Sequence, residues 1–324
     1  MSGNDRLVEV KDLSKWFVTR GTMGKKNTIR AVDGVSFHIE KGETFGLVGE
    51  SGCGKTTLGR TIVRLYDATA GQILFEGKDI AGLSKEALKP YRRRMQTIFQ
   101  DPYSSLNPYM NVEQIITEPL NLSQKLSKGD CRARVEAMLR EVGMSPDDME
   151  KYPHEFSGGQ RQRIGVARAL IVQPDFVLCD EPISALDVSI QAQIVNLLED
   201  LQRSMGLTYL FVAHDLSMVR HISKRIGVMY MGQIVEISPA PDLYENPLHP
   251  YTRALLSAIP IPDPKKAREQ KRAPLQGDPP SPLAAQTGCA FHTRCPAAKP
   301  DCARERPALK AYAPGHLAAC FLAG

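Results

Sequence analysis

A glycine-rich loop is the part of this 324-residue chain whose residue types and spacing point most directly to chemistry. Gly, four residues, Gly, Lys and Thr follow one another from Gly49 to Thr56 (GESGCGKT), after an apolar run at 44–48 and before a helix expected from Lys55. Glycines let successive backbone N–H groups and a helix N-terminus face one anion, while the lysine reaches terminal phosphates and the threonine hydroxyl can bind magnesium. A glycine-rich turn without a ligand is the alternative. We expect ATP contacts from Gly49, Glu50, Ser51, Gly52, Cys53, Gly54, Lys55, Thr56 and Thr57.

Two acidic residues, Asp180 and Glu181, end a second apolar run, Phe176 to Cys179. A magnesium nucleotide needs a carboxylate at the end of a buried strand. We therefore expect Asp180 to hold Mg²⁺ together with Thr56, and Glu181 to polarise the water that attacks the terminal phosphate. Two acids at a solvated strand end, with no such role, are the alternative.

A second anion site is predicted at Ser157, Gly158, Gly159 and Gln160, because serine and two glycines here precede a helix-compatible run to Leu170. The chain already has one phosphate loop, and this segment has no lysine of its own. It is therefore expected to cap a nucleotide held by another subunit.

With these motifs in order, the chain resembles the nucleotide-binding subunits of ABC transporters. The resemblance implies that Gln100 is the glutamine that touches magnesium and the attacking water, that Asp187 lies in a loop crossing the dimer interface, and that His214 contacts the terminal phosphate. It places Phe17 on adenine, with Trp16 as the neighbouring candidate. A one-residue shift in a strand turns a ring to the other face, so both remain open.

The fold implied by the resemblance is α/β: a P-loop NTPase of the ABC type with a mixed sheet core, an antiparallel β subdomain and a helical subdomain. β-rich runs at 7–10, 35–39, 44–48, 72–75, 176–179, 208–212, 226–230 and 233–237 supply the strands. Continuous apolar runs suit a parallel sheet buried on both faces, whereas the first runs suit an antiparallel subsheet. Helical patterns at 112–120 and 128–142 lie in a helical subdomain at about 100–170.

The composition changes near residue 256. The last 68 residues carry 11 of the 23 prolines and four of the seven cysteines. They also carry ten basic and five acidic residues, which accounts for the whole net charge of +5, so the first 256 residues have no net charge. We therefore predict an ATPase domain at 1–256 and a small Cys/Pro-rich C-terminal domain at 257–324. Nucleic acid is not expected as a partner, because the basic residues of this tail are mixed with acids and prolines and form no dense run.

Four tail cysteines, Cys289, Cys295, Cys302 and Cys320, have 5, 6 and 17 residues between them. Zinc sites usually show closer pairs, and the loose spacing suits a Cys₄ iron–sulfur site. This segment also resembles that of importer ATPases that carry a 4Fe-4S cluster. A 4Fe-4S cluster is the expectation, with zinc or unligated thiols as alternatives.

Residues 188–193 (VSIQAQ) and 246–256 (NPLHPYTRALL) resemble the ATP-binding subunits of bacterial oligopeptide and dipeptide importers, and 101–108 (DPYSSLNP) resembles their F-type ATPase. The resemblance implies a heterodimer with a paralogous D-type ATPase, two transmembrane permeases and an extracytoplasmic peptide-binding protein. The first ten residues, MSGNDRLVEV, lack the apolar region of a signal sequence, so a peripheral position on the cytoplasmic face of the inner membrane is expected. Related importers carry nickel, opines or oligosaccharides. A non-transport ABC ATPase acting on nucleic acid or ribosomes is the remaining alternative.

Overall fold

The computed structural model describes residues 5–20, 26–123, 126–259, 277, 280 and 287–323. The strands are β1 (Arg6–Arg20), β2 (Lys26–Glu40), β3 (Thr44–Val48), β4 (Ala70–Phe75), β5 (Lys78–Asp79), β6 (Met95–Ile98), β7 (Phe176–Asp180), β8 (Thr208–Val212), β9 (Arg225–Tyr230), β10 (Gln233–Pro239), β11 (Lys310–Ala313) and β12 (His316–Ala318). The α-helices are α1 (Lys55–Ile62), α2 (Lys89–Arg94), α3 (Pro102–Ser105), α4 (Val112–Ser123), α5 (Lys128–Glu141), α6 (Gly158–Leu170), α7 (Val188–Met205), α8 (Leu216–Ile222), α9 (Ala240–Glu245), α10 (Pro250–Ser257) and α12 (Pro300–Arg304). Two 3₁₀ turns, η2 (Pro146–Glu150) and η3 (Pro153–Glu155), precede α6.

Two sheets organise the chain. The larger has the order β11-β12-β10-β9-β3-β8-β7-β6, and its strands β9, β3, β8, β7 and β6 run parallel to their neighbours in that group. The smaller, β2-β1-β4-β5, is antiparallel. The mixed core sheet and the antiparallel subsheet predicted from the sequence are therefore confirmed.

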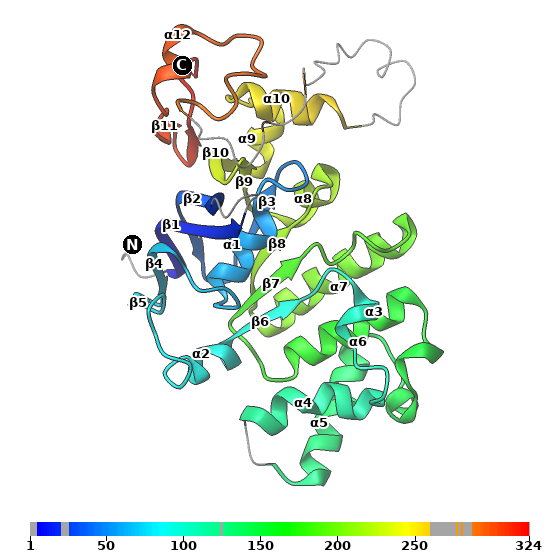
Figure 1. Ribbon diagram of the computed structural model, residues 1–324. Coiled ribbons are helices and arrows are strands. Elements are labelled where there is room, and N and C mark those ends of the chain that lie inside the picture. Colours follow the sequence, from blue (N-terminus) through cyan, green and yellow to red (C-terminus); the bar gives the residue numbers. More distant parts are fainter. Residues whose placement is uncertain are drawn as a thin grey trace, which may run out of the picture.

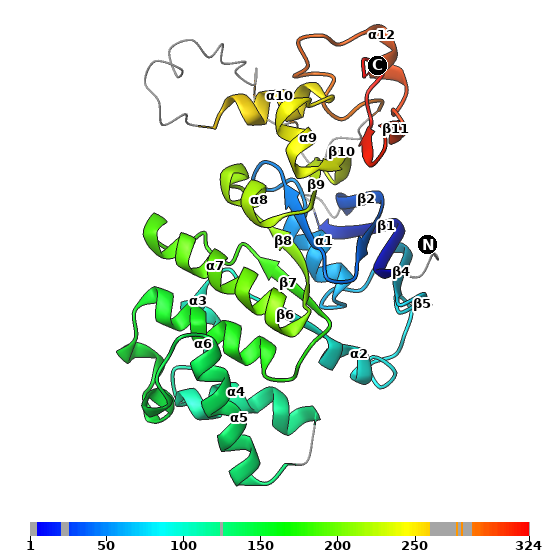
Figure 2. The same ribbon diagram turned by 180° about the vertical axis from the view of Figure 1, so that it is seen from behind.

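The helices α3 to α6 follow one another between β6 and β7 and form the lower half of the molecule in Figure 1. Helix α4 packs against α5 and α6. The C-terminal elements lie at the opposite end, beyond β9 and β10, as the reverse view in Figure 2 also shows. Strand β12 pairs with β10, so the tail extends the larger sheet.

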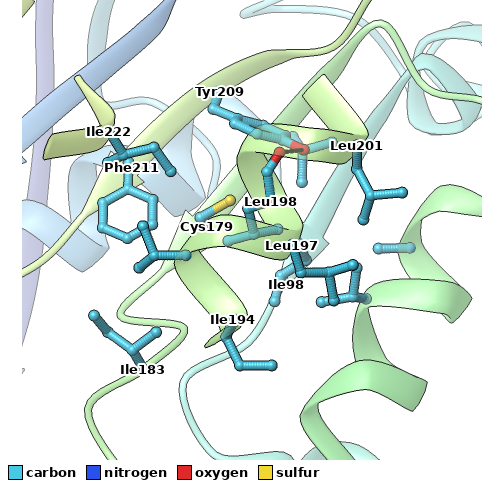
Figure 3. Packing of buried hydrophobic residues seen from close by; sticks show 14 of the residues in the cluster. Ile98, Cys179, Ile183, Ile194, Leu197, Leu198, Leu201, Tyr209, Phe211 and Ile222 are labelled. Carbon is cyan, nitrogen blue, oxygen red and sulfur yellow. Dashed lines mark hydrogen bonds between the residues drawn. The ribbon is translucent and has the colours of Figure 1, made fainter. Parts of the chain in front are cut away.

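The core lies on both faces of the parallel strands. All five residues of β3, β7 and β8 are buried. Figure 3 shows Ile194, Leu197, Leu198 and Leu201 of α7 packed beside Cys179, Tyr209 and Phe211 of the sheet. Tyr209 is fully buried, and its hydroxyl donates to the Leu198 carbonyl at 3.0 Å, which fixes the helix against the sheet. Burying each of these large apolar side chains stabilises the fold by roughly 1.5–3 kcal/mol.

Within the described ranges, no helix is both long enough and apolar enough to span a bilayer.

Candidate active site

Four parallel strands end at one edge of the larger sheet, and the residues expected to do chemistry follow these ends. The phosphate loop follows β3, Gln100 follows β6, Glu181 follows β7 and His214 follows β8. Because parallel strands share an edge at their carboxyl ends, residues far apart in sequence meet there. Ser51, Gln100, Glu181 and His214 line one cleft of about 440 Å³.

The phosphate loop needs its glycines for space as well as for conformation. Gly49 has φ 152° and Gly54 has φ 110°, values that other residues rarely adopt. A Cβ at Gly49 would lie 2.2 Å from the Met229 carbonyl oxygen, and one at Gly54 would lie 2.1 Å from that of Ala31. The loop therefore packs closely against β9 and β2, and this packing fixes the positions of its backbone N–H groups.

Lys55, the first residue of α1, is buried with only 4% of its surface exposed. Its Nζ donates to the carbonyl oxygens of Gly49 at 2.8 Å and Glu50 at 3.1 Å. The ammonium group is thus held inside the curl of the loop, where a phosphate would be bound.

Asp180 and Thr56 form the candidate magnesium site. The Thr56 hydroxyl donates to Asp180 Oδ1 at 2.9 Å, and Asp180 is fully buried at the end of β7. Magnesium in nucleotide sites takes one or two protein oxygens and completes its shell with water and phosphate oxygens. The pair therefore fits this ion.

Arg60 is a member of this site that the sequence reasoning did not find. Its Nε and Nη2 both lie 3.0 Å from Asp180 Oδ2, so it neutralises the buried carboxylate. The sequence could have indicated this residue, because Thr56 and Arg60 are four positions apart and so lie on one face of the predicted helix.

Glu181 lies where the water-polarising carboxylate was predicted. Its φ of +50° is unusual for a non-glycine residue, and strained backbone of this kind clusters at functional sites. Gln100 Nε2 donates to Glu181 Oε2 at 2.9 Å, and His214 Nδ1 lies 3.8 Å from the same oxygen. The histidine side chain is 60% exposed, so it faces the open side of the cleft.

The segment from Ser157 to Gln160 begins α6. The Ser157 hydroxyl accepts from the Gln160 N–H at 3.4 Å, and Gln160 Oε1 accepts from the Ser157 N–H at 3.0 Å. Among the described residues that line the 440 Å³ cleft, none comes from this segment.

The loop that ends at Asp187 packs against the same segment. A Cβ on Gly159 would lie 2.6 Å from Ile190 in the first turn of α7, which Asp187 precedes as the N-cap residue. The close approach explains the need for glycine at this position. The predicted signature and the end of the dimer loop therefore pack together, while Ser184 and Ala185 of that loop line the 440 Å³ cleft beside Ser51.

Phe17 and Trp16 lie on β1, partly buried. The Phe17 ring meets Tyr66 edge-on at 5.7 Å, whereas Arg30 lies 4.9 Å from the Trp16 ring centre. Since neighbours in a strand face opposite sides, only one of the two rings can stack on adenine.

A larger cleft of about 1120 Å³ opens beside the site, between α2, β6, α4 and α6. Among the described residues that line it are the basic Arg64, Lys89, Arg92, Arg93, Arg94 and Arg168, one acidic residue, Glu118, and apolar side chains such as Phe99 and Leu122. Phe99 lines this cleft while its neighbour Gln100 lines the smaller one.

The prediction of a 4Fe-4S cluster at Cys289, Cys295, Cys302 and Cys320 is wrong. Over the described part of the chain, which includes all four, no group of three or more His, Cys, Asp or Glu side chains could hold a metal ion. Zinc therefore has no site here either.

The four thiols have local surroundings within the tail. Burial raises the pKa of Cys289 to about 11 and also raises that of Cys295. Cys302 Sγ accepts the Lys299 N–H at 3.4 Å, and Cys320 Sγ accepts the Leu322 N–H at 3.3 Å. Cys302 and Cys320 therefore have local backbone partners, and Cys302 is buried.

Two family models match the chain. One, described as ABC transporter, matches residues 32–184, and the other, described as oligopeptide/dipeptide transporter, C-terminal region, matches residues 235–302. A solved structure of the dimeric, post-hydrolysis ATP-binding cassette MJ0796 bound to ADP and Pi is similar, with a TM-score of 0.65 and 28% identity over 72% of this chain and 98% of that one.

Full-length relatives agree with these matches. The putative oligopeptide transport ATP-binding protein YkfD of Bacillus subtilis is 54% identical over 98% of this chain and 95% of its own length. The oligopeptide transport ATP-binding protein AppF of the same organism is 51% identical over 99% and 98%. The chain therefore belongs to the ABC transporter family, in the branch of the oligopeptide transport ATP-binding proteins.

Proposed function

We propose that this chain hydrolyses ATP in the 440 Å³ cleft and thereby powers the import of peptides. The observation that carries the proposal is the meeting of Gln100, Glu181 and His214 beside the Lys55 loop, at the shared edge of four parallel strands. The names of the relatives YkfD and AppF support peptides as the transported class.

In the proposed reaction, loop N–H groups and the Lys55 ammonium bind the phosphates and offset their charge. Thr56 and Asp180 would hold Mg²⁺, which supplies positive charge to the phosphates when bound. Gln100 is a further candidate ligand for this Mg²⁺ ion. Glu181 accepts a proton from the attacking water, Gln100 holds that carboxylate through its 2.9 Å hydrogen bond, and His214 donates to the terminal phosphate.

A head-to-tail dimer completes the site. Ser157 to Gln160 would cap the ATP held by the second subunit, and Asp187 would lie at the interface. This arrangement fits the absence of that segment from the chain's own cleft, among the described lining residues. The second subunit is proposed to be a paralogous D-type ATPase, and the division at residue 256 into an ATPase domain and a C-terminal domain belongs to the same proposal. Phe17 is proposed to stack on adenine, with Trp16 as the alternative.

The 1120 Å³ cleft is the proposed docking surface for a permease. Arg64 and Arg94 already form ion pairs with acidic residues of this chain. The exposed Lys89, Arg92 and Arg93 favour an acidic, partly apolar segment as the occupant of the cleft. Because Phe99 and Gln100 are adjacent and line the two clefts, movement of a docked segment would shift the residue that holds Glu181. The protein would then lie at the cytoplasmic face of the inner membrane, alongside two permeases that receive peptide from an extracytoplasmic binding protein.

Stimulation of hydrolysis tests this proposal. Phosphate release is measured for the purified chain with its D-type partner, with two permeases in vesicles, and with the binding protein in the presence or absence of peptide. A peptide-dependent rise supports import. Stimulation by DNA or ribosomes, but not by the permeases, would contradict it.

A further inference from the structure

A residue of the C-terminal segment contacts the phosphate loop directly. Arg294 Nη1 donates to Glu50 Oε2 at 2.8 Å and Nη2 donates to Glu50 Oε1 at 3.1 Å. These residues are 244 positions apart, and Arg294 is only 7% exposed. A bidentate pair with a nearly buried arginine fixes the orientation of the carboxylate as well as its charge.

Aromatic side chains hold this pair in place. The Glu50 N–H donates to the hydroxyl of Tyr251, which is fully buried, and Arg294 Nη1 also donates to the Tyr230 hydroxyl at 3.4 Å. Phe291, three residues before Arg294, packs on Tyr230 and Tyr251 with ring centres 5.3 and 5.4 Å apart. The arginine is therefore seated on a rigid support made jointly by the end of β9, by α10 and by the tail.

Glu50 is the residue through which this contact reaches the ATP site. Its carbonyl oxygen accepts from Lys55 Nζ at 3.1 Å and from the Cys53 N–H at 3.2 Å. Glu50 thus forms hydrogen bonds through its side chain, its backbone N–H and its carbonyl oxygen. This carbonyl is one of the two that accept a hydrogen bond from the Lys55 ammonium group.

The charge of Glu50 would oppose nucleotide binding if it were unpaired. A carboxylate in the loop that surrounds a triphosphate repels it, and the repulsion is strong where little water screens the charges. Arg294 offsets this charge, and Glu50 in turn raises the pKa of the guanidinium, which stays protonated.

We propose that Arg294 is a positioning residue of the ATP site, which neutralises Glu50 and holds the first turn of the phosphate loop in the form that accepts ATP. The inference rests on the proposed ATP site and assigns to the C-terminal segment a part in nucleotide affinity.

The test is a calorimetric titration of MgATP into the purified full-length chain and its variants. We expect Arg294→Ala to weaken ATP binding on the order of tenfold. Introducing Glu50→Gln into the Arg294→Ala chain removes the unpaired charge and should recover most of the lost affinity. Arg294→Lys should retain more affinity than Arg294→Ala, because the charge stays while the two-point contact is lost.

Arg306→Ala is the matched control. Arg306 also ties the tail to the core, through the Asp33 carboxylate at 3.1 Å and carbonyl at 2.7 Å, but it does not contact the loop. ATP affinity should survive this change, and thermal unfolding of every variant is measured alongside. An affinity drop in Arg306→Ala equal to that in Arg294→Ala would reduce the arginine's role to docking of the tail.

The remaining outcomes separate this inference from the proposed function. Wild-type affinity in Arg294→Ala, or no recovery in the double variant, overturns the positioning role while the ATP site stands. Failure of the wild-type chain to bind MgATP would overturn the proposed function, and the inference with it.

Discussion

The side-chain amide of Gln100 donates a hydrogen bond to Glu181 Oε2 at 2.9 Å, although 81 positions separate the two residues. Gln100 follows β6 and Glu181 follows β7, and these strands run side by side in parallel. The carboxylate is thereby held at the cleft that both residues line. This contact links the proposed base to the residue next to the larger cleft.

Replacing Glu181 with glutamine should leave ATP binding intact and lower turnover by at least about 100-fold, because the amide cannot accept the proton of the attacking water. The bound ATP should then hold the dimer closed. Phosphate release and size-exclusion chromatography with ATP measure the two effects. Near-normal phosphate release would remove Glu181 as the base.

Lys55→Ala should abolish ATP binding or turnover, because its buried ammonium is the cation enclosed by the loop. Equilibrium binding of a fluorescent ATP analogue is the measurement. Lys85→Ala, at an exposed lysine outside the site, is the control and should bind as the wild type does. High affinity in Lys55→Ala would refute the assignment.

The stability of the protein should fall as the pH drops from 6.5 towards 4, partly because of His249. Burial lowers the pKa of this side chain from 6.5 to about 4, and its Nδ1 accepts the Tyr251 N–H at 3.1 Å. The unfolded chain takes up a proton in this window while the folded chain does not, so folding loses stability as the pH falls. Between pH 7.5 and pH 5 the loss from this group is about 2 kcal/mol.

His249→Asn keeps an N-cap acceptor for α10 but cannot titrate. Its free energy of unfolding in urea should depend less on pH over this range, whatever its absolute value. Equal pH dependence in the two proteins would show that the pKa of His249 does not differ between the folded and the unfolded state, and the prediction would fail.

Arg92→Glu should weaken stimulation by the permeases several-fold and leave the basal ATPase rate near its normal value. Arg92 is exposed and lines the larger cleft, where a reversed charge repels an acidic docked segment. Arg203→Glu, on the exposed face of α7, is the control. Stimulation in Arg92→Glu equal to that in the control would argue against docking in this cleft.

Much of the architecture could be predicted because its signals are local. The apolar runs at 44–48 and 208–212 became β3 and β8 with the same bounds, and helices begin at Val112 and Lys128 as the apolar spacing indicated. Strand β6 was not predicted, because its four residues, MQTI, mix polar and apolar types. β11 and β12 were missed as well, since a Pro-rich segment gives weak strand signals and they form only by pairing at the sheet edge with β10.

The cysteines mark where reasoning from sequence failed. Their number and loose spacing suggested a cluster, but spacing along the chain does not reveal whether the side chains form a group that could hold a metal ion.

The sequence by itself determined the phosphate loop, the carboxylates after β7 and the alternation of strands and helices, because each depends on neighbouring residues or on a short hydrophobic period. Only the tertiary structure decided which distant residues meet. The parallel order of β6, β7, β8 and β3 brings Gln100, Glu181 and His214 to one edge. The packing of the tail on Tyr230 and Tyr251 brings Arg294 to Glu50. These contacts arise from sheet order and core packing, which no local stretch of sequence encodes.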